Sequence, residues 1–213
     1  MAIGGDGALV PAAGIRGSVA IVERKTYPRE KTCGDGLTPR AVKQLTDMGL
    51  ADELTKYHRY QGLRSTGMGR ELELNWPKHP LYPPYGYVVR RRDLDWAVAR
   101  NAEAAGATIF QGTDALEPIT DRGFVRGAVV QHKGASSTEE IRARYVVVAD
   151  GANSRYGRAL GTFRTREWPY GTAIRTYWQT PRHQDPWIES ALDVKDRNGN
   201  PMPGYGWIFP VGD

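Results

Sequence analysis

Two short runs of apolar, β-branched residues mark where we expect buried parallel strands. Residues 19–22 form one run, which ends at Glu23, and residues 145–149 form the other, which ends at Asp150. An uninterrupted apolar run is typical of a parallel strand that is covered on both faces. The pattern therefore predicts two strands of one parallel sheet, each with a carboxylate at its C-terminal end.

Two further segments have helical signals. Thr38 and Pro39 are typical of an N-cap followed by proline at the first helical position, and they open a helix over residues 40–45 that stops near Gly49. The clearest helix covers residues 94–105, where apolar side chains recur on one face before Gly106. The hydrophobic members of that face are Leu94, Ala97, Val98 and Ala102.

The rest of the chain alternates in the manner of β-strands. Residues 62–89 and 170–209 are expected to form a second, mixed sheet, with a turn at residues 196–200. A strand is expected at residues 107–110, and a hairpin within residues 125–144. The fold class is therefore α/β, in which a parallel sheet is interleaved with a mixed β-rich domain.

Composition agrees with a globular protein. The 213 residues are 40% hydrophobic and 25% charged, and 29 Lys and Arg exceed 24 Asp and Glu by a scattered net charge of +5. No nucleic-acid-binding motif accompanies this charge, so we expect no nucleic-acid partner.

Cys33 is the single cysteine, which excludes an intramolecular disulfide and a multi-cysteine metal site and fits a reducing cytoplasm. Because no apolar run approaches the ~20 residues that span a bilayer, any membrane contact is expected to be peripheral.

The acidic residue at the end of the first strand has a chemical interpretation. Dinucleotide-binding folds hold a ribose through a carboxylate at such a strand end, and Glu23, followed by Arg24, occupies that position. A solvated glutamate is the plain alternative. The second strand adds a stronger signal.

Asp150 and Gly151, with Ser154 and Arg155 after them, resemble the Asp-Gly motif of the superfamily of flavoprotein hydroxylases and geranylgeranyl reductases. The resemblance implies that Asp150 and Gly151 lie near the pyrophosphate of FAD. The alternative is an ordinary strand-turn-helix capped by Ser154.

Residues 91–95 resemble the Arg-x-x-Leu-Asp element of the same superfamily, which implies that Arg91 approaches the flavin. Arg90 or Arg92 takes this role if the register differs. Without a cofactor, the segment would simply place Asp93 and Asp95 at the positive end of a helix dipole.

Residues 28–39 resemble the cysteine-glycine segment of geranylgeranyl reductases and of menaquinone reductases of the mycobacterial type. The resemblance implies that Cys33, Gly34, Asp35, Gly36 and Leu37 line the flavin ring, where glycines permit close approach of the backbone. Cys33 is either a candidate catalytic residue or a small buried hydrophobe.

An aromatic segment near the end of the chain resembles the Tyr-x-Trp-x-Phe-Pro signature of geranylgeranyl reductases. Tyr205, Trp207 and Phe209 share one side of a strand and precede Pro210. We interpret these four residues as an apolar wall for a substrate chain, with plain core packing as the alternative.

One expected element is missing. Flavoproteins of this type open with a strand and a Gly-x-Gly-x-x-Gly turn. Here residues 5–10 place Val10 at the third glycine, and residues 1–3 leave too little room for a strand. We therefore expect an incomplete member of the family that binds FAD poorly by itself; a near-stoichiometric flavin spectrum would contradict this.

The resemblance implies an incomplete FAD/NAD(P)-binding, Rossmann-like sheet in residues 1–60 and 91–160, with a substrate domain in residues 61–90 and 161–213. The implied activity is FAD-dependent reduction of isoprenoid C=C bonds in a geranylgeranyl lipid or the polyprenyl tail of menaquinone, with NAD(P)H or another reductant as electron donor. The implied location is the cytoplasm, at the inner face of the cell membrane. A flavin monooxygenase and a non-catalytic fragment are the alternatives.

Overall fold

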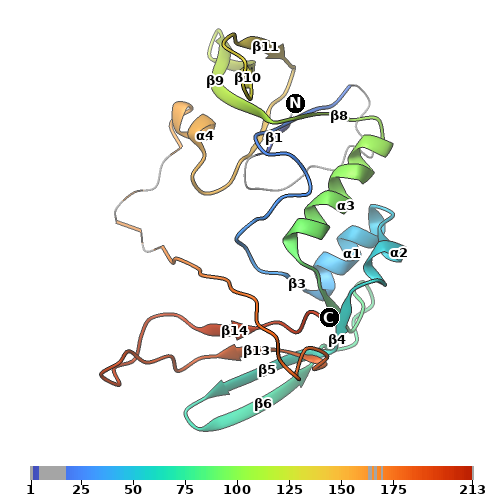
Figure 1. Ribbon diagram of the computed structural model, residues 1–213, viewed down its shortest axis with the longest axis vertical. Helices are drawn as coiled ribbons and strands as arrows, with labels where there is room; N and C mark the ends of the chain where they lie inside the picture. The colour runs from blue at the N-terminus through green and yellow to red at the C-terminus, as the bar shows by residue number, and fades with distance from the viewer. Residues whose placement is uncertain (1, 5–17, 163–164, 166, 169, 213) are drawn as a thin grey trace. The chain divides into compact units, whose positions relative to one another are not determined.

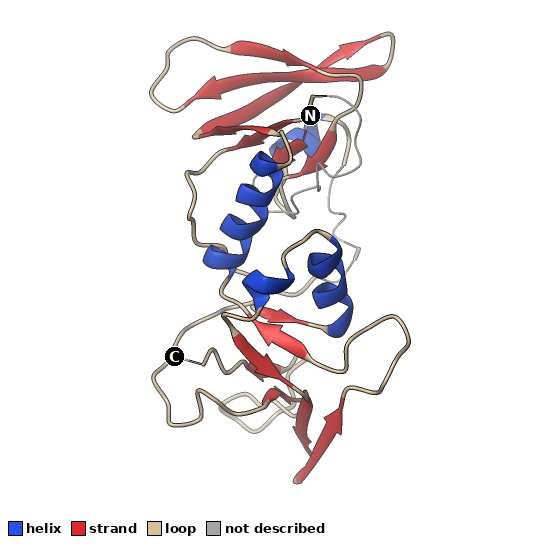
Figure 2. Cartoon of the chain, turned by 90° about the vertical axis from the view of Figure 1, so that its right-hand side faces the viewer, coloured by secondary structure: helices blue, strands red, loops and turns tan. Residues whose placement is uncertain are grey.

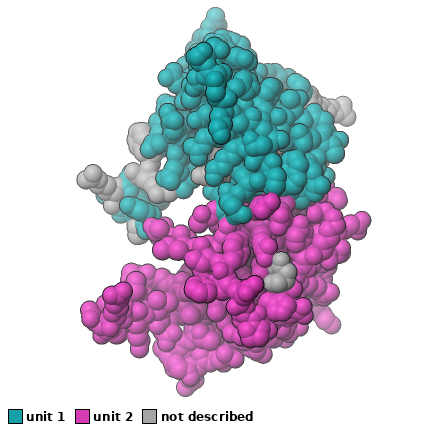
Figure 3. Space-filling model, viewed as in Figure 1, with its two compact units in different colours: residues 1–31, 95–170 teal, residues 32–94, 171–213 magenta. Residues whose placement is uncertain are grey.

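The computed structural model describes residues 2–4, 18–162, 165, 167–168 and 170–212. The chain divides into two compact units, of which unit 1 comprises Met1–Lys31 and Asp95–Tyr170, and unit 2 comprises Thr32–Leu94 and Gly171–Asp213 (Figure 3). These units divide the chain at other positions than the sequence-based domains do. In particular, residues 32–60 belong to unit 2 instead of joining the first parallel strand.

Unit 1 contains a four-stranded parallel sheet in the order β12–β1–β2–β8, of which Figure 1 labels β1 and β8. Its strands are β1 (Ala2–Gly4), β2 (Ala20–Glu23), β8 (Thr108–Gln111) and β12 (Val147–Ala149). The prediction that residues 1–3 leave too little room for a strand is wrong. Three residues suffice for β1 because the ladders of β2 and β12 hold it from both sides. The expected glycine turn at residues 5–10 lies outside the described residues.

Strand β12 differs from its prediction in burial. Val147 and Val148 are 43% and 37% exposed, whereas the apolar run predicted a strand covered on both faces. The reason is its place at the edge of the sheet, since no described strand lies beyond it.

Helix α3 (Arg91–Ala104) begins at Arg91, before the predicted start at Leu94. The Arg90 carbonyl accepts hydrogen bonds from the amides of Asp93 and Leu94, at 2.9 and 3.0 Å, so the first turn is already formed there. Farther along the helix, Ala102 packs with Ile21 and Ala107 in the core beside the parallel sheet. The chain leaves the helix through Gly106, whose φ of 95° suits glycine.

An antiparallel sheet of three strands completes unit 1 (Figure 2). It contains β9 (Thr113–Asp121), β10 (Phe124–His132) and β11 (Glu139–Arg142). The hairpin of β10 and β11 was predicted, but β9 was not. The short helix α4 (Arg155–Ala159) follows β12 and inserts Tyr156, which is fully buried and donates a hydrogen bond to the Gly127 carbonyl.

Unit 2 contains a small antiparallel sheet in the order β3–β7–β4, together with two helices. Its elements are β3 (Gly36–Leu37), β4 (His58–Tyr60), β7 (Gly86–Val88), α1 (Pro39–Asp47) and α2 (Ala51–Leu54). Helix α1 starts with Pro39 as predicted, although the Thr38 side chain makes no capping hydrogen bond.

A mixed sheet in the order β14–β13–β5–β6 forms the rest of unit 2. Its strands are β5 (Gly62–Gly67), β6 (Arg70–Asn75), β13 (Trp187–Ala191) and β14 (Gly206–Ile208). Two predictions need correction here. Strand β7 belongs to the small sheet, because it pairs with β3 and β4, and residues 171–180 form no strand.

No helix among the described residues is long and apolar enough to cross a membrane.

Candidate functional site

The two strand-end carboxylates of unit 1 lie at the same edge of the parallel sheet. Gly4, the last residue of β1, pairs with Glu23 on one side and with Ala149, which precedes Asp150, on the other. The placement predicted from the two apolar runs is therefore confirmed. From β1 the chain goes to β2 on one side and later to β12 on the other, and ligands of open α/β sheets bind at such a switch point.

Glu23 is fully buried and engaged by its own loop. Its Oε1 accepts a hydrogen bond from the Lys25 amide at 2.9 Å, and its Oε2 accepts bonds from Arg29 Nη2 at 3.0 Å and Tyr27 Oη at 3.4 Å. Burial raises the pKa of the Glu23 carboxyl, although the Lys25 amide and the Arg29 guanidinium oppose this rise. Contact between Glu23 and a ribose remains a prediction.

Arg29 joins this strand end to helix α3. Its Nη1 donates to Asp95 Oδ2 at 2.9 Å while its Nη2 holds Glu23, and all three residues are less than a tenth exposed. The sequence did not single out Arg29. Three basic residues follow the strand, namely Arg24, Lys25 and Arg29, and nothing in their spacing tells which one pairs with Glu23. Only the folded loop shows that Arg24 is exposed and that Arg29 turns inward.

The turn after β12 contains Asp150, the second of the two strand-end carboxylates. Asp150 Oδ1 is buried and has no hydrogen-bond partner among the described residues. Gly151 has a φ of 87°, which favours glycine, and Ser154 Oγ caps helix α4 by accepting the Gly157 amide at 2.6 Å. A buried polar atom without a partner is costly, so it suits a group that a ligand satisfies. These residues fit FAD, with Asp150 as the side chain that would meet it.

In unit 2, the loop of residues 33–37 is held by Asp35. The Asp35 carboxylate accepts hydrogen bonds from the Arg91 amide at 3.0 Å, Arg175 Nη1 at 2.9 Å and Tyr177 Oη at 2.8 Å. Cys33 is exposed, so its interpretation as a small buried hydrophobe is wrong. Arg175 and Tyr177 carried no motif in the sequence, and only the fold brings them to the loop.

The loop glycines lie against the aromatic segment. A Cβ added at Gly34 or Gly36 would meet the Phe209 ring at 3.7 or 3.5 Å, which is ordinary contact. Two motifs about 170 residues apart in the sequence thus meet within unit 2. Leu37 is buried in β3. Contact between these loop residues and a flavin ring, and between Arg91 and flavin, remains a prediction.

The aromatic side chains predicted to form a wall do share one side. The rings of Trp207 and Phe209 stack at 6.2 Å with an interplanar angle of 11°, and Tyr205 lies 5.4 Å from Trp207. A pocket of about 450 Å³ within unit 2 is lined by Trp207, Phe209 and Pro210, whereas Tyr205 is not among its lining residues. Three further aromatic residues line the pocket, and the sequence patterns did not predict them: Tyr177, Trp178 and Trp187.

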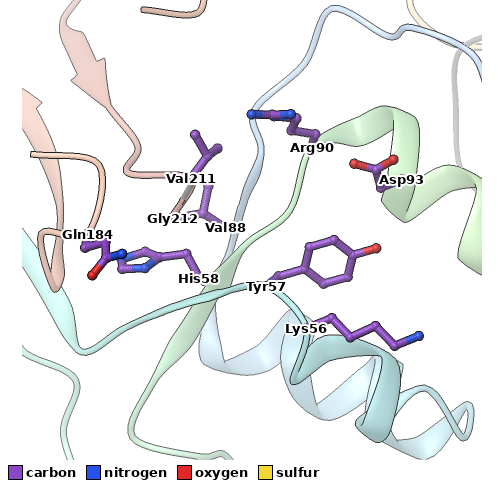
Figure 4. Close-up of a pocket in the computed structure, with 9 residues that line it drawn as sticks. All are labelled: Lys56, Tyr57, His58, Val88, Arg90, Asp93, Gln184, Val211 and Gly212. Carbon is purple, nitrogen blue, oxygen red and sulfur yellow. The ribbon is translucent and has the colours of Figure 1, made fainter. Parts of the chain in front are cut away.

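A second pocket of unit 2, of about 410 Å³, has a more polar lining (Figure 4). Lys56, His58, Arg90 and Asp93 contribute side chains to it, and His58 Nε2 lies 2.8 Å from the Asp185 carbonyl. This pocket contains Arg90, one of the alternatives to Arg91.

A parallel sheet with Glu23 and Asp150 at one edge, and a buried Asp150 Oδ1 that has no partner within the described part of the chain, is typical of the dinucleotide-binding class of proteins that includes flavoproteins. Residues 7–197 match the family described as FAD binding domain. The chain belongs to this family, and its cofactor is FAD.

Two curated proteins that the chain resembles in sequence are reductases. The chain is 42% identical over 209 residues to a menaquinone reductase of Mycobacterium tuberculosis, covering 98% of the chain and 50% of the relative. It is 30% identical over 201 residues to a digeranylgeranylglycerophospholipid reductase of Methanopyrus kandleri, covering 92% of the chain and 48% of the relative. The chain thus spans about half the length of these relatives.

A solved structure shows the same fold. The myxobacterial chondrochloren halogenase CndH, an FAD-dependent halogenase, superposes with a TM-score of 0.73 over 100% of this chain and 49% of its own. At 20% identity, this likeness concerns the fold alone.

Proposed function

We propose that this chain is part of an FAD-dependent reductase that saturates C=C bonds of isoprenoid chains, with the polyprenyl tail of menaquinone or a geranylgeranyl lipid as substrate. The observation that carries the proposal is similarity along nearly the whole chain to a menaquinone reductase, at 42% identity. The lipid reductase of Methanopyrus kandleri supports the same substrate class.

The aromatic pocket of unit 2 has the chemistry that this substrate needs. Trp178, Trp187, Trp207 and Phe209 give it a largely apolar lining, and burying each CH₂ of a chain is worth about 0.8 kcal/mol. Its volume of about 450 Å³ accepts a few isoprene units rather than a whole polyprenyl chain. We therefore expect the pocket to hold the part of the chain around the reacting double bond.

The reaction adds one hydride and one proton across a C=C bond. Reduced FAD supplies the hydride when bound, and the protein holds the cofactor and the alkene in place. On the sheet edge of unit 1, Asp150 would accept a hydrogen bond from the bound cofactor. In unit 2, Trp207 and Phe209 would position the alkene chain and exclude water from it.

We further propose that NAD(P)H or another reductant supplies the electrons, and that the protein works in the cytoplasm at the inner face of the cell membrane. The reductant is needed because each turnover consumes reduced FAD, and the location follows from the substrate class, since a polyprenyl chain resides in the bilayer. Co-sedimentation with anionic lipid vesicles tests the second one.

The decisive experiment incubates the chain, alone and extended to the length of its relatives, with FAD, NADPH and menaquinone. Mass spectrometry should show a product that has gained two hydrogens in its side chain. Oxygen-dependent consumption of NADPH with a hydroxylated product would overturn the proposal in favour of a flavin monooxygenase, which shares the Asp-Gly and Arg-x-x-Leu-Asp elements.

A further inference from the structure

The carboxylate of Asp35 connects three segments of unit 2. Asp35 is 3% exposed, and its side chain accepts the three hydrogen bonds from Arg91, Arg175 and Tyr177 described above. The Asp35 carbonyl also accepts the Val89 amide at 2.9 Å. A buried carboxylate with charge-assisted partners holds its neighbours more firmly than neutral hydrogen bonds do.

Two side chains of the segment of residues 171–180 contact this carboxylate. It contains no helix or strand, and Arg175 is partly buried whereas the other residues of the segment are exposed. Arg175 Nη1 donates both to Asp35 Oδ1 at 2.9 Å and to the Cys33 carbonyl at 3.0 Å, and its guanidinium lies 4.9 Å from the centre of the Tyr177 ring. The segment also forms one wall of the aromatic pocket, through residues such as Ile174 and Trp178.

We infer that Asp35 is a positioning residue that ties this wall of the aromatic pocket to the loop of residues 33–37. Arg175 and Tyr177 are the groups through which it acts. The pocket wall and the cysteine-glycine loop then open and close together, so a ligand that orders the wall also orders the loop. The connection between the two segments does not rest on the substrate proposed above.

Two measurements test this connection, one for each segment. Hydrogen exchange by mass spectrometry follows residues 32–38, which include the hydrogen-bonded strand β3, and limited proteolysis with chymotrypsin follows the exposed coil of residues 171–180. Arg175→Gln removes the ion pair, so it should speed exchange in residues 32–38 and cleavage within residues 171–180 about tenfold. Tyr177→Phe removes one hydroxyl and should change both measurements in the same direction by a smaller factor. Arg175→Lys keeps the charge and should restore part of the protection.

Arg182→Gln is the matched control. Arg182 also lines the aromatic pocket, but it pairs with Asp185 and Glu189 instead of Asp35. Exchange in residues 32–38 should therefore stay at the wild-type rate. Wild-type exchange of this loop in folded Arg175→Gln and Tyr177→Phe proteins would overturn the inference, with circular dichroism as the check of folding.

Geranylgeraniol, used as an apolar chain, separates this inference from the proposed function. In the wild-type protein it should slow both the exchange of residues 32–38 and the cleavage within residues 171–180, and in Arg175→Gln only the cleavage. If it slows neither segment while the variants behave as expected, the connection stands and the proposed substrate class fails. If it slows only residues 171–180 in the wild-type protein, the connection is overturned.

Discussion

Two carboxylates at the ends of strands in the same sheet differ in their hydrogen bonding. At the end of β2, Glu23 is fully buried and receives hydrogen bonds from Lys25, Tyr27 and Arg29. At the end of β12, Asp150 has a buried Oδ1 without a partner among the described residues. The sheet places both carboxylates at one edge, but the loop that follows each strand determines which hydrogen-bond donors reach it. The first carboxylate is held by side chains of its own loop, and the second has an oxygen without a partner in the described part of the chain.

The largest expected effect is at the Glu23 end. Arg29→Met removes the cation shared by Glu23 and Asp95 and leaves two buried carboxylates without it, so the free energy of unfolding should fall by about 3–5 kcal/mol. Urea denaturation followed by circular dichroism measures this. Lys43→Met, which breaks an exposed pair with Asp47, should cost less than about 1 kcal/mol. Similar losses in both variants would contradict the structural role of Arg29.

The second-largest expected effect concerns the affinity for FAD and involves Asp150, at the end of β12. Asp150→Ala should weaken FAD binding about tenfold or more, because a hydrogen bond to a charged acceptor is lost, while stability changes little. Titration of FAD by fluorescence quenching measures the affinity. Asp121→Ala, at an exposed position, serves as the control. If Asp150→Ala binds FAD as the wild-type protein does, the contrast between the two strand ends is wrong.

A smaller effect is expected within the same turn. Ser154→Ala removes the acceptor of the Gly157 amide and should lower the free energy of unfolding by about 1 kcal/mol. Ser154→Asp retains a capping oxygen and should recover most of this loss. Equal stability of Ser154→Ala and the wild-type protein would show that the cap does not stabilise helix α4.

The smallest effect is a pH dependence. Because burial raises the pKa of Glu23, its folded state holds a proton to higher pH than its unfolded state. Its contribution to stability is therefore present below its ordinary pKa of 4.5 and is lost as pH rises through the folded pKa. Glu23→Gln should remove this part of the pH dependence, which urea denaturation over about pH 4–7 reveals. An unchanged profile would contradict the raised pKa.

Asp185 in unit 2 has the opposite sign. Although burial opposes it, hydrogen bonds from Arg64 and Arg182 lower the pKa of the Asp185 carboxyl. Its contribution to stability is present above its ordinary pKa of 3.8 and is lost as pH falls through the folded pKa. Asp185→Asn should therefore change the acid side of the profile, and Glu23→Gln the side above it.

Local patterns were enough for the elements with strong periodicity. Strand β2, helix α1 and the hairpin of β10 and β11 appear where apolar runs, Pro39 and turn residues predicted them. Strand β1 was missed because three residues carry no periodicity of their own. Strand β7 was placed in the wrong sheet because alternation identifies a strand without naming its partner.

The sequence by itself determined the family, the acidic strand ends and the aromatic segment of residues 205–209, because these depend on residue type and short spacing. Only the tertiary structure decided that Arg29 pairs with Glu23, that Asp150 Oδ1 is buried without a hydrogen-bond partner in the described part of the chain, and that Arg175 and Tyr177 contact Asp35. These contacts join residues that lie in separate elements, up to about 140 positions apart along the chain. No local pattern encodes such a contact, because burial and hydrogen bonding are settled only when the elements pack.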